Sequence, residues 1–591
     1  MRALQYLNRY LKKYRLLLLL GLLFTVSSRV FAVIAPSLVG DSITEIEQFI
    51  QSGATDLTSI KKVLLTNIAL ITGAALISVG FTFAMRQTII NVSRHIEFDL
   101  KNTIYDHYQK LSLRFYKQNR TGDLMNRISE DVSKVRMYVG PALMYSINTF
   151  TLFIIVIGYM ISVAPKLTLY TLLPLPILSF MIYRLSKAIH ERSTLVQEML
   201  SQLSTFTQES FSGINVIKSY AIEPDRMSEM RRVSAESHSK NMSLVQVQAW
   251  FFPMMILLIG ISNILVIFIG GTQYINGQIE LGILAEFIIY VNMLTWPVAT
   301  VGWVTSIVQQ AEASQKRINE FLGQEPEIQD SNTTYKNLDS VAIAFKNVHF
   351  TYDDTGIHAL NDVSFELAEG KTLAVIGPTG SGKTTLLQLL SKTYLPNSGE
   401  VMLGGNPLNA YTQLDIRNAM SVVPQQPFLF SDSIAYNIRF GKQEATQEEV
   451  ELAAKQAAVH ENIIDFKAKY DTIVGERGIT LSGGQKQRVS IARALIKKSK
   501  LLLLDDCLSA VDTKTEETIL SLLKAKKDTT TVIVCHRVSS AKNADFILTL
   551  KNGKVAQFGS HKSLVNKEGY YKELYTQQQL KEKSEEILYH G

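Results

Sequence analysis

Long apolar runs fill the first half of the chain and are absent from the second. Six of them have the length of a membrane-spanning helix, about 20 residues, and they cover approximately residues 17–40, 63–85, 141–163, 167–183, 251–275 and 281–306. From residue 341 onward, short apolar strands alternate with helices, as in a largely parallel sheet covered by helices. The pattern predicts an all-α membrane domain with six spans at 1–320, a linker at 321–340 and an α/β domain at 341–591.

Basic residues next to these spans indicate the orientation of the chain. They cluster before the first span and after the second, whereas the connections 41–62, 164–166 and 276–280 hold few of them. The positive-inside rule therefore places both termini and the α/β domain in the cytoplasm. We expect a multi-pass protein of the inner (plasma) membrane. The formal net charge of +7 lies mostly beside these spans, so we expect a lipid bilayer and no nucleic acid as a partner.

The two connections on the cytoplasmic side, about 86–140 and 184–248, have the spaced apolar residues of amphipathic helices. We therefore expect the membrane helices to continue through them. At a rise of about 1.5 Å per residue, a 25-residue arm would reach about 37 Å beyond the bilayer, far enough to touch a separate domain. The turns of these arms lie near 115–132 and 209–223. Each turn is either an exposed amphipathic helix or a contact with a separate domain.

The α/β domain contains a candidate phosphate-binding loop. The sequence GPTGSGKTT at 377–385 matches G-x-x-x-x-G-K-[ST], follows a strand-like run and precedes a helix-like run, which is the context that such a loop requires. Its backbone N–H groups would surround a polyphosphate, Lys383 would reach the β and γ phosphates, and the Thr384 hydroxyl would hold Mg²⁺. The candidate ATP-binding residues here are Gly377, Pro378, Thr379, Gly380, Ser381, Gly382, Lys383, Thr384 and Thr385.

Two carboxylates follow a strand of four leucines at 501–504. Asp505 and Asp506 therefore lie at the carboxyl end of a buried strand, where such sheets bind ligands. We expect Asp505 to hold the Mg²⁺ through water. A second such strand, 531–535, delivers His536 to the same edge.

The run LSGGQKQR at 481–488 resembles the signature sequence of ATP-binding cassette (ABC) proteins. Tyr352 resembles the base-stacking aromatic, Gln425 the Q-loop glutamine, TIVGERG at 472–478 the exporter-type contact loop, SAVD at 509–512 the D-loop and His536 the switch histidine. With six spans ahead of the cassette, the whole chain is similar to a bacterial ABC exporter half-transporter.

The resemblance implies an exporter-type membrane domain fused to a phosphate-loop ATPase domain with a helical subdomain. It also implies a second half-transporter as partner, because ATP is held between the phosphate loop of one cassette and the signature of the other. In this chain the signature residues are Ser482, Gly483, Gly484 and Gln485. The resemblance further assigns Gln425 to Mg²⁺ and, with His536, to catalysis. ATP binding and hydrolysis would turn a central cavity outward and export a hydrophobic or amphipathic substrate such as a drug or lipid.

One residue departs from the family pattern. Where the family usually has a glutamate that polarises the attacking water, this chain has Asp506. A carboxylate withdrawn by about 1 Å can lower the rate on the order of a hundredfold. We therefore expect poor hydrolysis at the site built on this phosphate loop, and a heterodimer with one degenerate site in preference to a homodimer.

Two charged residues lie within the apolar spans. Arg29 in the first span and Glu286 in the sixth are both about 21 Å from the inner surface by helix rise. Intramembrane charges normally face a partner or a watery cavity, so we expect both to point inward, where they would pair with each other or contact substrate. Both are therefore candidates for a substrate pathway. The alternative is that each lies near an interface and snorkels or pairs locally.

Other functions are compatible with parts of this pattern. The spans argue against a soluble cassette ATPase of DNA repair or translation. An ATP-gated or regulatory membrane protein, or an importer with the exporter fold, remains an alternative to an exporter, and the sequence does not identify the cargo.

Overall fold

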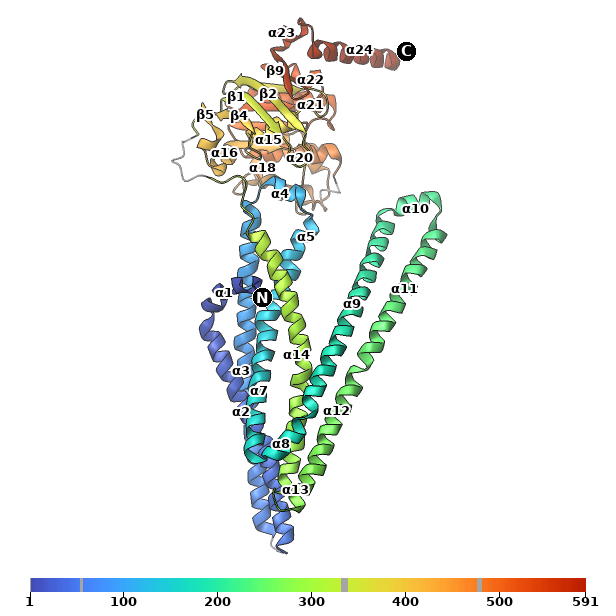
Figure 1. Ribbon diagram of the computed structural model, residues 1–591. Coiled ribbons are helices and arrows are strands. Elements are labelled where there is room, and N and C mark those ends of the chain that lie inside the picture. Colours follow the sequence, from blue (N-terminus) through green and yellow to red (C-terminus); the bar gives the residue numbers. More distant parts are fainter. Residues whose placement is uncertain (1, 54–56, 331–337, 476–480, 591) are drawn as a thin grey trace. The chain divides into compact units, whose positions relative to one another are not determined.

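The computed structural model describes residues 2–53, 57–330, 338–475 and 481–590, and it is drawn in Figure 1. The chain forms two compact units. The first contains Met1–Lys110 and Asn119–Glu325, and the second contains Leu111–Gln118 and Pro326–Gly591. The break at residue 325 falls inside the expected linker 321–340.

The described part of the first unit is helical. Its α-helices are α1 Asn8–Lys13, α2 Arg15–Gln51, α3 Leu57–Lys110, α5 Thr121–Asn126, α6 Val132–Met137, α7 Leu143–Val163, α8 Pro165–Leu172, α9 Pro174–Ser212, α10 Ile214–Tyr220, α11 Glu223–Ala249, α12 Phe251–Leu265, α13 Gly271–Ile275 and α14 Leu281–Leu322. Five helical segments of the described residues are long and apolar enough to cross a membrane, at Arg15–Gln51, Leu57–Lys110, Thr121–Val163, Glu223–Ile275 and Leu281–Leu322. They contain the first, second, third, fifth and sixth expected spans.

The expected fourth span, 167–183, is divided between two helices. α8 ends at Leu172 and α9 begins at Pro174, and the backbone N–H of Leu173 donates to Tyr170 at 3.3 Å. Proline has no N–H to continue the helical ladder, so the helix is interrupted here. This stretch is not among the five segments above, and a crossing of the membrane at this point stays a prediction.

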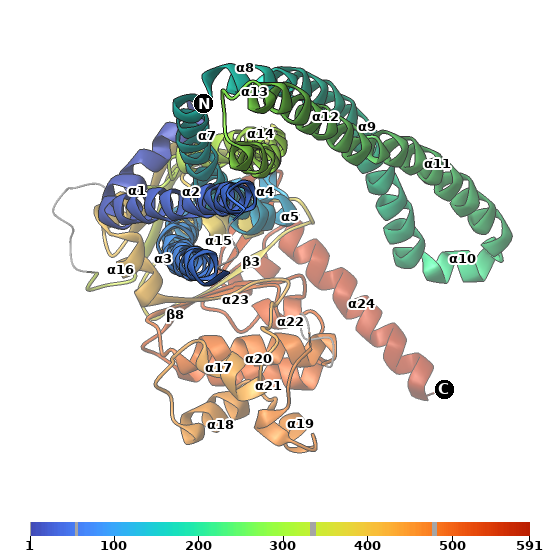
Figure 2. The ribbon, with the colours of Figure 1, turned by 90° about the horizontal axis from the view of Figure 1, so that it is seen from below.

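Helices continue far beyond the apolar runs, as the cytoplasmic connections predict. α3 extends from the second expected span to Lys110, and α9 extends to Ser212. α11 runs back beside α9 and leads into α12. Figures 1 and 2 show this pair of helices side by side, joined by the short α10. The turns of both connections are therefore short helices, α4 (Leu113–Gln118) and α10.

A close helix crossing joins α2 to α14. The backbone N–H of Gly282 donates to Thr44 Oγ1 at 3.2 Å. A Cβ atom placed on Gly282 would overlap with the carbonyl oxygen of Gly40. Small residues at such crossings let two membrane helices approach at backbone distance.

The second unit contains two sheets. A six-stranded sheet has the order β10-β9-β3-β8-β7-β6, and a four-stranded sheet has the order β2-β1-β4-β5. In the larger sheet β6, β7, β8, β3 and β9 are parallel, and β10 is antiparallel to β9. The strands are β1 Ile343–Thr351, β2 His358–Leu367, β3 Thr372–Ile376, β4 Ser398–Leu403, β5 Asn406–Pro407, β6 Met420–Val423, β7 Leu501–Asp505, β8 Thr530–Val534, β9 Phe546–Lys551 and β10 Lys554–Gly559.

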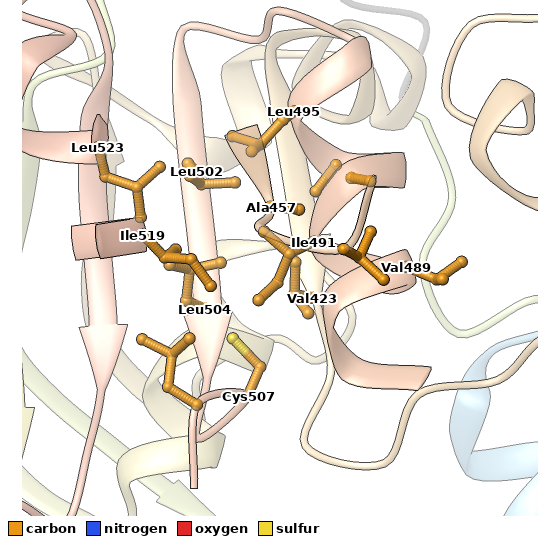
Figure 3. Packing of buried hydrophobic residues seen from close by; sticks show 14 of the residues in the cluster. Val423, Ala457, Val489, Ile491, Leu495, Leu502, Leu504, Cys507, Ile519 and Leu523 are labelled. Atoms are coloured by element: carbon orange, nitrogen blue, oxygen red, sulfur yellow. The ribbon is translucent and has the colours of Figure 1, made fainter. Parts of the chain in front are cut away.

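Helices cover the larger sheet on both faces. The described α-helices of this unit are α4, α15 Lys383–Leu390, α16 Gln413–Ala419, α17 Ile434–Arg439, α18 Gln447–Gln456, α19 His460–Ile464, α20 Gly483–Ile496, α21 Thr513–Ala525, α22 Val538–Ala541, α23 His561–Val565 and α24 Tyr570–His590. The leucines of β7 alternate between two cores. Leu502 and Leu504 pack with α20 and α21 (Figure 3), whereas Leu501 and Leu503 pack with α15 and the smaller sheet. The prediction of a strand buried on both faces is confirmed.

The α2–α14 crossing provides a test of the membrane unit. We expect Gly282→Ala to lower the free energy of unfolding by about 1–3 kcal/mol, because the added methyl group meets backbone that cannot rotate away. Gly260→Ala in α12 is the matched control, since its Cβ would meet nothing within 4 Å. Thermal unfolding in detergent measures both variants. Equal stability of the two variants would show that this crossing is not tightly packed.

Candidate nucleotide-binding site

The phosphate loop lies between β3 and α15. β3 ends at Ile376 and α15 begins at Lys383, so the loop stands at the carboxyl edge of the parallel sheet. Gly382 has a φ of 96°, and a Cβ at this position would collide with the carbonyl oxygen of Ala359. Glycine is therefore required here both for the left-handed backbone and for the close approach of β2.

Lys383 is folded back over its own loop. Its Nζ donates to the carbonyl oxygens of Gly377 and Pro378, both at 2.9 Å, and the residue is only 7% exposed. Burial lowers the pKa of Lys383, and the nearby Asp506 and Asp505 oppose this effect. The neighbouring Ser381 is buried, and its Oγ has no hydrogen-bond partner. A buried ammonium and a buried, unpaired hydroxyl in one loop are suited to a phosphate group.

A hydroxyl and a carboxylate meet beside this loop. Thr384 Oγ1 donates to Asp505 Oδ1 at 3.1 Å, which joins the start of α15 to the end of β7. Burial raises the pKa of Asp505, and the hydrogen bond from Thr384 acts in the opposite direction. Oxygen ligands from one hydroxyl and one carboxylate fit Mg²⁺, which usually keeps several of its waters.

Asp506 lies next to two polar groups that follow other strands, β6 and β8. Gln425 Nε2 donates to Asp506 Oδ2 at 3.4 Å, and His536 Nε2 is 3.8 Å from the same oxygen. The backbone of Asp506 has a φ of 45°, a left-handed conformation that aspartate adopts more readily than most residues. The structure thus brings together the three residues that the sequence assigns to catalysis.

Tyr352 forms another wall of this site. It lines a pocket of about 380 Å³, and burial raises its pKa. Its hydroxyl donates to Gln388 Oε1 and lies 3.0 Å from Thr385 Oγ1. The other lining residues are Ile357, Ala359, Thr379, Gly380, Ser381, Gly382, Lys383, Thr384, Thr385, Gln425, Asp505, Asp506, Val534 and His536.

The signature residues do not line this pocket. They form the start of α20, where Ser482 Oγ accepts from the backbone N–H of Gln485 at 3.3 Å. Gln485 Oε1 in turn accepts from the backbone N–H of Ser482 at 3.0 Å, which completes a capping box. Among the described residues, a Cβ on Gly483 would meet nothing within 4 Å, whereas one on Gly484 would meet the carbonyl oxygen of Ala510 at 2.7 Å. The backbone at Gly483 is therefore the open part of this helix start.

The structure also shows residues that sequence reasoning missed. Ile357, Ala359 and Val534 line the pocket, and Gln388 holds the Tyr352 hydroxyl. Gln388 is one helical turn from Thr384, so the two residues lie on the same face of α15. That spacing was the only sign in the sequence that Gln388 lies near the site. Of the expected contact loop 472–478, residues 476–478 lie outside the described residues. In the D-loop, 509–512, Asp512 caps α21 by accepting from the N–H of Thr515 at 3.0 Å.

Comparisons with known proteins decide the family. Residues 16–298 match the family described as ABC transporter transmembrane region, and residues 360–509 match that described as ABC transporter. The multidrug resistance-like ATP-binding protein MdlA of Escherichia coli is 35% identical over 97% of this chain and 95% of its own length. This chain belongs to the ABC transporter family. The sequence-based assignment to that family is therefore confirmed.

Two further ABC transporter proteins resemble this chain over nearly their whole length. The probable multidrug resistance ABC transporter ATP-binding/permease protein YheI of Bacillus subtilis is 33% identical over 98% of both chains. A solved structure of a bacterial Atm1-family ABC exporter with ATP bound superposes with a TM-score of 0.77 at 26% identity, over 97% of this chain and 98% of that one. The fold is thus an exporter-type helical membrane domain joined to an α/β ATP-binding domain, the architecture of an ABC half-transporter.

Arg29 and Glu286, the two charges expected within the membrane, do not form an ion pair with each other in the described residues. Glu286 is 4% exposed, and its Oε1 has no hydrogen-bond partner. Tyr159 and Tyr290 pack edge to face beside it, with ring centroids 5.6 Å apart. Arg29 is half-buried, and its Nε also has no partner.

Proposed function

We propose that this chain is one half of a dimeric ABC transporter that exports a hydrophobic or amphipathic substrate across the inner membrane at the expense of ATP. The observation that supports this most directly is the pocket in which Lys383, Thr384, Asp505 and Asp506 meet, in a chain that also has an ABC membrane domain. The names of MdlA and YheI refer to multidrug resistance, which fits a substrate of this kind.

Each group in the pocket has a distinct task in this proposal. The loop N–H groups and Lys383 bind the phosphates, and the Tyr352 ring stacks on the base. Thr384, Asp505 and Gln425 hold Mg²⁺, which neutralises negative charge on the phosphates when it is bound. Asp506 orients the attacking water, and His536, which lies beside it, contacts the terminal phosphate.

The signature of this chain serves the other half of the transporter. Ser482 to Gln485 do not line this chain's own pocket, and they form a helix start at which the backbone of Gly483 is open. Such a helix start binds phosphate. ATP between two cassettes favours their closed arrangement, because it is bound better there than in the open one, and the helical arms pass this change to the membrane spans. Alternating access of a central cavity follows from that shift.

Asp506 favours a heterodimer as the assembly. Its carboxylate is one methylene shorter than a glutamate in the position that faces Gln425 and His536. The site on this phosphate loop therefore hydrolyses ATP slowly, while the intact signature completes a faster site on the partner. A homodimer would contain two slow sites.

Glu286 and Arg29 belong to the proposed substrate pathway. A carboxylate oxygen and a guanidinium nitrogen that are both buried without a hydrogen-bond partner are costly within a membrane. Either a polar group of the substrate or a residue of the second half-transporter would satisfy them.

Slow hydrolysis at Asp506 also supports a second candidate, an ATP-gated membrane protein. Flux in inside-out vesicles with the ATP-binding domains outside separates the two functions.

We expect ATP to drive a lipophilic dye into the vesicles against its gradient. Lys383→Met, combined with the same change in the partner's phosphate-loop lysine, abolishes this accumulation. Lys371→Met is the control, because Lys371 forms only an exposed ion pair with Asp545. Passive equilibration with ATP would indicate gating, and ATP-driven efflux from the vesicles would indicate an importer.

The degenerate site can be tested within the assembled transporter. Ser482→Arg removes the signature from the partner's site and leaves the site of this phosphate loop to be measured alone. In that background we expect Asp506→Glu to raise ATP hydrolysis by up to about a hundredfold, because the longer carboxylate reaches the water. Asp506→Asn is the control and should not raise it. An unchanged rate with glutamate would show that carboxylate length does not limit this site.

A further inference from the structure

Helix α4 belongs to the same compact unit as the nucleotide pocket, although it lies between the second and third membrane spans in the sequence. Arg114 on this helix forms two ion pairs within that unit. Its Nη1 is 2.8 Å from Asp353 Oδ2 and 3.2 Å from Glu327 Oε1. Asp353 directly follows the pocket residue Tyr352, so these ion pairs hold α4 beside the segment that carries Tyr352.

Lys117, one turn further along α4, contacts two aromatic rings, those of Tyr352 and Tyr394. Its Nζ lies 5.4 Å from the centroid of the Tyr352 ring and 5.2 Å from that of Tyr394, within cation–π range. The two rings meet edge to face with centroids 5.7 Å apart. Partial burial lowers the pKa of Lys117, but Tyr394, Tyr352 and Asp354 outweigh it and raise the pKa overall. Lys117 therefore keeps its positive charge at neutral pH.

Tyr352 is contacted from three directions. Its hydroxyl is held by Thr385 and Gln388 of α15, the helix that begins at the phosphate loop. Its ring lines the pocket, whereas Lys117 is not among the residues that line it. The ammonium thus reaches the ring from outside the pocket, and a base stacked inside and Lys117 outside share one aromatic ring.

We propose that Lys117 is a positioning residue for base binding at this chain's own site, and that it makes α4 respond to the base as distinct from the phosphates. Base stacking orders the Tyr352 ring, which strengthens the contact with Lys117 and fixes α4. α4 is continuous in sequence with α3, so the occupancy of this site is communicated to the second and third spans. Because hydrolysis here is slow under the proposed function, on which this inference rests, the signal persists between turnovers.

Hydrogen exchange of residues 111–118 in the assembled transporter tests this inference. A non-hydrolysable ATP analogue should slow exchange in this segment, and inorganic tripolyphosphate, which has no base, should not. Lys117→Met should remove the protection by the analogue and weaken its binding two- to fivefold, which corresponds to about 0.5–1 kcal/mol of cation–π interaction. Binding of tripolyphosphate should not change.

Two further variants separate this role from a general effect on the fold. Lys117→Arg keeps a cation over the rings and should restore the protection. Lys110→Met removes an exposed lysine at the end of α3 and should leave the protection unchanged. Equal protection by tripolyphosphate, or protection that survives Lys117→Met, would overturn the inference. Base-dependent protection without uphill transport in vesicles would instead contradict export and leave this role of Lys117 intact.

Discussion

The convergence of unlike charges at one edge of a parallel sheet is the constraint on which the ATP-binding unit depends. A buried ammonium at Lys383, a buried carboxylate at Asp505 and a partly buried one at Asp506 lie around one pocket. Burial of each charge is costly unless it is paired and hydrogen-bonded. The sheet makes this arrangement possible, because β3, β7 and β8 are parallel neighbours and their carboxyl ends deliver the loop, the two aspartates and His536 to one place. A triphosphate with Mg²⁺ supplies the complementary charges.

The same geometry explains why a second chain is needed. The signature at the start of α20 is folded as a capped helix end, yet its residues do not line this chain's pocket. A site divided in this way converts nucleotide binding into an attraction between two cassettes. α4 and α10 are located at the turns of the long helical connections, where such an attraction can be passed to the spans. At α4, the ion pairs of Arg114 and the contact of Lys117 with Tyr352 are the interactions that would transmit this attraction.

Short-range patterns predicted most of this architecture. The phosphate loop and the strand of leucines depend on neighbours in the sequence, so their positions could be read directly from it. Residues from distant segments could not. Lys117 reaches Tyr352 only through the fold, and no spacing links the two. The interruption at Pro174 was also missed, because a hydropathy average does not register a missing N–H in the helical ladder. Equal depths predicted that Arg29 and Glu286 face inward, but depth does not specify partners, and the described residues show no ion pair between them.

A division of labour between two unlike halves is the central claim that joins these observations. The most direct measurement compares ATP hydrolysis by this chain purified alone with hydrolysis by the complex that copurifies with it from native membranes. The account predicts slow hydrolysis by the chain alone and fast, substrate-stimulated hydrolysis by a complex that contains a second, different half-transporter. Brisk, transport-coupled hydrolysis by a dimer of this chain alone would contradict it.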